Sequence, residues 1–141
     1  MLRRSLMLAA LVLAALVAAG CGGSEEAGGS ATAEEESLTP QAAAEEISEI
    51  ERMLDEALAS YEAGDAAEAE EIVGDAYLEH FEKVEHPLEE VDHELMEELE
   101  VLISTTLRDE IRAGAPTPEI EGLVSAAKTG LAEARSLLEA S

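Results

Sequence analysis

Acidic residues and one histidine occur in the middle of the sequence at spacings that could hold a metal ion. Glu82, Glu85 and His86 stand at positions i, i+3 and i+4, so a helix would present them on one side. Carboxylate oxygens combined with an imidazole suit iron, manganese, zinc or copper ions. Glu100 is a fourth candidate, which an adjacent helix could bring to the same place. These four residues are the predicted metal site.

The helical periodicity places two of these acids beside an apolar face. At 100° per residue, Glu85 falls between Gly74 and Leu78, and Glu100 falls next to Leu107. A carboxylate held against a core should form an ion pair, take up a proton or bind a cation, because an isolated buried charge is costly. The position of these acids therefore makes them candidates for a site.

The composition supports a less specific interpretation as well. The chain has 33 Asp and Glu against 8 Lys and Arg, a formal net charge of −25 in 141 residues, so acidic clusters also arise by chance. In that case Lys83, Arg108 or Arg112 would pair with whichever acid is partly buried, and the other acids would be solvated. Both interpretations remain open from the residues alone.

The charge and the missing motifs restrict the function. A surface this acidic repels phosphate backbones, which argues against nucleic-acid binding. The sequence has no glycine-rich nucleotide motif, no GxSxG, no HExxH and no CxxC, so we expect a protein that is not an enzyme. An acidic helical module that recognises a basic protein partner without catalysis is the alternative to metal binding.

Start and stop signals divide residues 40–141 into four predicted helices. The predicted N-caps are Thr39, Asp65, Asp92 and Thr117, and the predicted stops are Gly64 and Gly114. Apolar residues recur on one face of each segment, and Pro87 predicts a kink or break near the end of the second. Short connections make neighbouring helices antiparallel. The fold expected is all-α, an up-down-up-down four-helix bundle.

Two of the predicted core faces are specific enough to test. The second helix should bury Val73, Tyr77, Phe81, Val84, Leu88 and Val91. The third helix should bury Leu95, Leu99, Leu102, Ile103 and Thr106.

The N-terminus is typical of an exported bacterial lipoprotein. Arg3 and Arg4 precede an uncharged apolar run, residues 6–19, which is too short for a comfortable membrane span. Small residues then lead to Cys21, the only cysteine, as in the lipobox where a cysteine is lipidated after cleavage. We expect a signal peptide over residues 1–20 and attachment to the outer side of the bacterial cell membrane, or to the outer membrane, through Cys21. A plain secretory signal with an incidental cysteine is the alternative.

A flexible linker is expected between the cysteine and the bundle. Residues 21–39 are rich in Gly, Ser, Ala and Glu, with Leu38 as the only large apolar residue. Such a segment cannot bury enough apolar surface to fold by itself.

The segment around the predicted metal site resembles a known pattern. It reads DAYLEHFEKVEHPL over residues 75–88, followed by Leu99-Glu100 and by LRDEIRAG over residues 107–114. This resembles the extracytoplasmic N-terminal domain of bacterial high-affinity iron permeases of the oxidase-dependent family, over roughly residues 57–138. The resemblance implies that Glu82, Glu85 and Glu100 match acidic positions of that family.

The resemblance also implies a function. Permease membrane helices do not follow the domain in this sequence, so we expect a detached, lipid-tethered version that does not itself transport iron. It would be accessory to iron or other cation uptake, with a separate iron permease or another iron-uptake component as partner.

Overall fold

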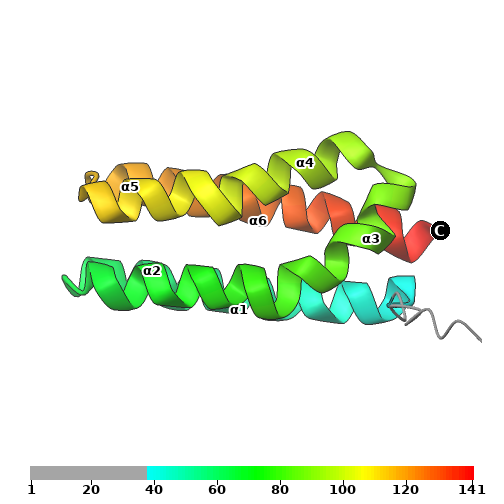
Figure 1. Ribbon diagram of the computed structural model, residues 1–141, viewed down its shortest axis with the longest axis horizontal. Coiled ribbons are helices and arrows are strands. Elements are labelled where there is room, and N and C mark those ends of the chain that lie inside the picture. The colour runs from blue at the N-terminus through cyan, green and yellow to red at the C-terminus, as the bar shows by residue number, and fades with distance from the viewer. Residues whose placement is uncertain (1–37) are drawn as a thin grey trace, which may run out of the picture. The chain divides into compact units, whose positions relative to one another are not determined.

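The computed structural model describes residues 38–141, which form helices without any strand (Figure 1). The elements are α1 (Pro40–Glu62), α2 (Ala66–Asp75), η1 (Ala76–Phe81), α3 (Glu82–Val91), α4 (His93–Val101), η2 (Leu102–Leu107), α5 (Arg108–Ala113) and α6 (Thr117–Ala140). Here η1 and η2 are π-helical segments that continue directly into the α-helices on either side. Residues 38–141 therefore form four long helices: α1, α2–η1–α3, α4–η2–α5 and α6. The predicted signal peptide, Cys21 and the linker up to residue 37 lie outside the described residues.

The four helices form the predicted up-down-up-down bundle. α1 packs against both α2 and α6, α2 packs against α5, and α4 with η2 packs against α6. In Figure 1 the chain reverses direction at each connection, so neighbouring helices run antiparallel. None of the helices within residues 38–141 is both long and apolar enough to cross a bilayer.

Most of the predicted helix ends are confirmed. The side chains of Thr39, Asp65 and Asp92 accept hydrogen bonds from the backbone N–H groups of Ala42, Glu68 and Leu95, at 3.2, 3.0 and 3.0 Å. Gly64 and Gly114 follow the first and third helices with φ of 91° and 71°, a region that favours glycine. These interactions satisfy backbone groups that helix ends would otherwise leave unpaired.

The prediction for the start of α6 was wrong in one detail. Thr117 is the first helical residue and not the cap, and Pro116 before it makes no side-chain hydrogen bond to the helix. Pro118 still lies in the first turn, where a missing N–H has no cost.

The π-helical segments change which residues face the core. Ala76 and Phe81 are five residues apart and both fully buried, because a π-helix makes i to i+5 hydrogen bonds. In the third helix, Leu107 and Ile111 are buried where the α-helical spacing predicts Leu102 and Thr106, which are only partly covered. The predicted core faces are otherwise largely confirmed.

The second helix bends without ending at its proline. α3 continues past Pro87 to Val91, which is 38% exposed and so does not join the predicted core face. Figure 1 shows the ribbon leaving the line of α2 as η1 passes into α3, and crossing toward α4. Pro87 cannot donate the hydrogen bond that would tie this turn to the preceding one. The segment beyond the bend, α3, contains Glu85 and packs against α4.

Among the described residues, the core is built from aliphatic side chains, and Phe81 is the only aromatic residue that is fully buried. No polar or charged residue within 38–141 is fully buried. The partly buried charges between helices are therefore the places where chemistry is concentrated.

Candidate functional site

The second and third helices meet at two places that differ in charge. Where α2 meets α5, Glu70 lies with Arg108 and Arg112; we call this the paired end. Where α3 meets α4, charges of the same sign come together; we call Glu82, Glu85 and Glu100 the acidic end.

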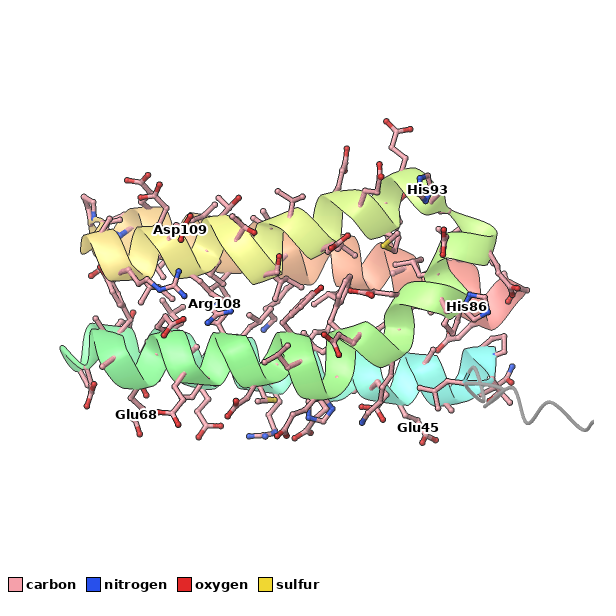
Figure 2. All side chains as sticks on the ribbon, in the orientation of Figure 1. Glu45, Glu68, His86, His93, Arg108 and Asp109 are labelled. Carbon is pink, nitrogen blue, oxygen red and sulfur yellow. The ribbon has the colours of Figure 1, made fainter. Side chains whose placement is uncertain are left out.

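The paired end is an arginine–carboxylate cluster. Arg108 donates from Nε to Oε1 of Glu70 at 2.7 Å, and Arg112 donates from Nη2 to the same oxygen at 2.6 Å. Nη2 of Arg108 also lies 2.5 Å from this oxygen, within ion-pair distance. Figure 2 shows Arg108 between the two helices. Its hydrogen bond is the largest influence on Glu70 and holds the pKa of that carboxyl below its usual range, against the opposing effect of burial.

A glycine makes room for this cluster. A Cβ atom on Gly74 would lie 3.3 Å from both Cζ and Nη2 of Arg108, which is tighter than ordinary packing. The absence of a side chain at position 74 therefore lets the guanidinium lie against the backbone of α2.

The acidic end centres on Glu85. Its Oε1 atom is buried and makes no hydrogen bond. Burial is the largest influence and raises the pKa of Glu85, and the charges of Glu100 and Glu82 raise it further. The neighbouring hydroxyl of Tyr77 opposes this by lowering the pKa. Three of the four predicted ligands are thus close enough to influence one another.

Tyr77 is a neighbour of Glu85 that we did not predict as part of a site. Burial raises the pKa of its hydroxyl, and the proximity and charge of Glu85 raise it further. The phenol therefore keeps its proton and acts as a donor. Its ring stacks on Phe81 with centroids 5.9 Å apart, which fixes its position. The sequence signal for this contact is the spacing: Phe81 and Glu85 follow Tyr77 by four and eight residues, which places the three side chains along one side of a helix.

His86, the fourth predicted ligand, lies apart from this group. Its side chain is 59% exposed, and its nearest acidic neighbour is Glu90, with Nε2 and Oε1 4.0 Å apart. Within residues 38–141, no three His, Cys, Asp or Glu side chains are arranged so that they could already hold a metal ion. The acidic end is thus a cluster of carboxylates without a complete set of ligands.

A second unpredicted contact joins the first and second helices. Nδ1 of His80 lies 2.6 Å from Oε2 of Glu46, and Lys83 donates to the other oxygen at 3.3 Å. Burial alone would raise the pKa of Glu46, but these two partners outweigh it and lower the pKa. No local spacing could reveal this contact, because it joins residues far apart in the sequence.

Comparison with known proteins adds no relative. No protein family, no curated protein and no solved structure matches this chain.

Proposed function

We propose that this protein is a non-catalytic lipoprotein, accessory to iron or other cation uptake, which binds or passes a cation at the acidic end. The observation that carries the proposal is Glu85, whose buried oxygen has no partner and whose charge is opposed by Glu82 and Glu100. A bound cation would relieve both unfavourable effects at once.

The ligand chemistry favours hard cations. With His86 exposed, the groups near Glu85 are carboxylate oxygens and the protonated hydroxyl of Tyr77. Oxygen ligands suit iron, manganese and calcium ions better than copper ions. Water would have to complete the coordination, since fewer than three protein ligands are in place within residues 38–141. Such a site suits exchange of a cation more than its storage.

The N-terminal sequence and the permease resemblance supply the rest of the proposal. Lipid on Cys21 would hold the bundle at the extracytoplasmic face of a membrane, beside a separate iron permease. A Cys21→Ala variant should fail to incorporate labelled fatty acid and should leave the membrane fraction. Retention of both properties in the variant would contradict lipidation at this residue.

Calorimetric titration of the full chain with ferrous, ferric, manganese, calcium and copper ions tests the cation site. We expect a Glu85→Gln/Glu100→Gln variant to lose about tenfold in affinity for the tightest-binding ion, equivalent to about 1.4 kcal/mol. The matched control is Glu45→Gln/Glu71→Gln, which removes two exposed charges from α1 and α2. Equal affinity of the two variants would contradict a site at the acidic end.

A further inference from the structure

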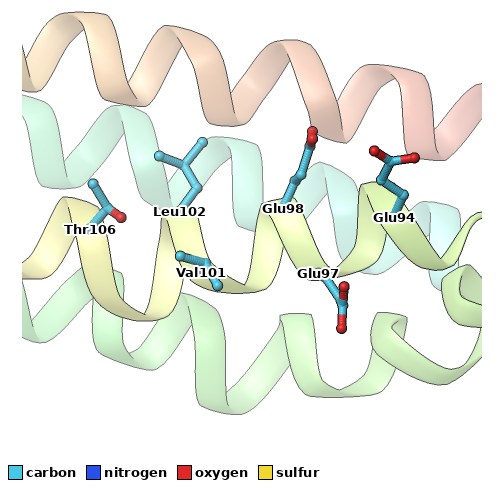
Figure 3. Close-up of a pocket in the computed structure, with 6 residues that line it drawn as sticks. All are labelled: Glu94, Glu97, Glu98, Val101, Leu102 and Thr106. Atoms are coloured by element: carbon cyan, nitrogen blue, oxygen red, sulfur yellow. The ribbon is translucent and has the colours of Figure 1, made fainter.

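One surface of α4 and η2 combines exposed apolar side chains with acids. It is an open, shallow depression of about 520 Å³ (Figure 3). We call this the α4 surface; it is lined by Glu94, Glu97, Glu98, Val101, Leu102 and Thr106. Val101 is 56% exposed, one of three large apolar side chains within residues 38–141 that are not covered. Together with the partly covered Leu102, it gives the depression an apolar part beside the acids.

The charge of the α4 surface is almost uncompensated. The sequence has no Lys or Arg between Lys83 and Arg108. Glu97 lies beside the imidazole of His93, with Oε1 3.4 Å from Nε2. Glu94 and Glu98 form no ion pair with any residue in the part of the chain that the structure describes.

A second helix could lie along the α4 surface. The lining residues recur every three or four positions along one side of α4 and η2, so the depression follows the helix axis. A second helix lying along it could place apolar residues against Val101 and Leu102. Basic residues on its flanks would then face Glu94, Glu97 and Glu98.

The negative charge of the α4 surface indicates which kind of partner it would bind. A second copy of this chain would bring the same acids against themselves, which is unfavourable. We propose that the α4 surface docks a basic amphipathic helix of another protein, with Lys or Arg on either side of an apolar stripe. The inference goes beyond the proposed cation site and does not depend on it, because none of the lining residues belongs to the acidic end.

A synthetic peptide tests the proposal on the full chain. The probe is a helical peptide of Leu and Lys with Leu at every third or fourth position, titrated by fluorescence anisotropy in the presence of a chelator. We expect Glu97→Lys/Glu98→Lys to weaken binding about tenfold, and Val101→Ser to weaken it about threefold. The matched control, Glu45→Lys/Glu71→Lys, makes the same change of charge on α1 and α2 and should change affinity less than about twofold.

Peptide-induced shifts of backbone amide resonances locate the contact. Shifts concentrated in α4 and η2 of the full chain would support the proposal. Equal weakening by the charge-reversed control, or shifts spread over all helices, would overturn it in favour of diffuse electrostatic attraction. Self-association that Val101→Ser abolishes would also overturn it, since a second copy would then be the occupant. Because the chelator removes metal ions, peptide binding is measured without a cation at the acidic end, and its outcome does not depend on the proposed cation site.

Discussion

The paired end and the acidic end place glutamates between the same two helices, yet the two ends differ in how the charge is balanced. At the paired end, two arginines hold the pKa of Glu70 below its usual range. At the acidic end, burial and two neighbouring acids raise the pKa of Glu85 above its usual range. In both places burial acts in the same direction, toward the neutral form. The guanidinium groups account for the opposite outcome.

This difference separates a stabilising contact from a place prepared for a ligand. Glu70 is already paired with the guanidinium groups of Arg108 and Arg112, so this contact contributes to stability. Glu85 keeps an unpaired oxygen, and folding with that carboxylate ionised costs free energy that a proton or a metal ion would recover. Glu70 can therefore serve as an internal comparison for Glu85, because its charge is already balanced by cationic side chains.

Removing the arginine should have the largest effect. Arg108→Ala leaves Glu70 with only the more exposed Arg112, and we expect the free energy of unfolding to fall by about 1–2 kcal/mol, allowing for partial exposure of the pair. Chemical denaturation near neutral pH measures this. Arg112→Ala is the control and should cost less, because half of its side chain is exposed. Equal losses would mean that burial does not distinguish the two arginines.

Removing the charge of Glu85 should increase the free energy of unfolding, whereas Arg108→Ala should decrease it. Since burial raises its pKa, the folded state binds the proton more tightly than the unfolded state does, so stability is lost as pH rises through the raised pKa. Glu85→Gln should therefore raise the free energy of unfolding near neutral pH by about 0.5–1 kcal/mol after solvent screening. Stability curves at a series of pH values measure the effect, which should shrink as the pH falls toward the ordinary carboxyl range.

The contribution of Glu70 to the pH dependence of stability provides the control for the Glu85→Gln variant. Glu70 has a lowered pKa, so its contribution is lost only as pH falls below the ordinary carboxyl pKa. Glu85→Gln should leave this acid-side loss unchanged while flattening the change on the neutral side. A variant that alters only the acid side would contradict the assignment of the raised pKa to Glu85.

The sequence predicts the bundle because each level of local information agrees. Thr39, Asp65 and Asp92 stand where caps are needed, and Gly64 and Gly114 stand where φ must be positive. The core faces differ at Val91, at the end of α3, and where the helices become π-helical, as at Leu107. The α-helical period cannot reveal such segments, because one extra residue in a turn shifts every later side chain.

The acidic end could be anticipated in part. The helical periodicity places Glu85 and Glu100 beside the core, and the structure brings them together with Glu82. It does not bring His86 to them: that side chain is 59% exposed and lies nearest to Glu90. Tyr77 was assigned to the core from its apolar face, since periodicity says nothing about where a hydroxyl finds its acceptor.

Two glycine substitutions test how closely Arg108 packs against the backbone of α2 at the paired end. Gly122 in α6 has nothing within 4 Å of where a Cβ would be, so Gly122→Ala should stabilise the protein by about 0.5–1 kcal/mol through helix propensity. Gly74→Ala offers the same gain but pushes on the Arg108 guanidinium. We expect the second variant to gain less than the first, by about 0.5 kcal/mol or more, in thermal unfolding. Equal gains would show that Arg108 moves aside at no cost.

The smallest effect should come from the tyrosine at the acidic end. Tyr77→Phe removes the hydroxyl that favours the ionised form of Glu85, so it should lower the free energy of unfolding near neutral pH by about 0.5 kcal/mol. The cost should be smaller in the Glu85→Gln background, because a hydroxyl donates more strongly to a charged acceptor than to a neutral amide. A double-mutant cycle by chemical denaturation measures this coupling. If Tyr77→Phe costs the same in both backgrounds, the hydroxyl acts through packing alone, and the acidic end has no donor that favours its charge.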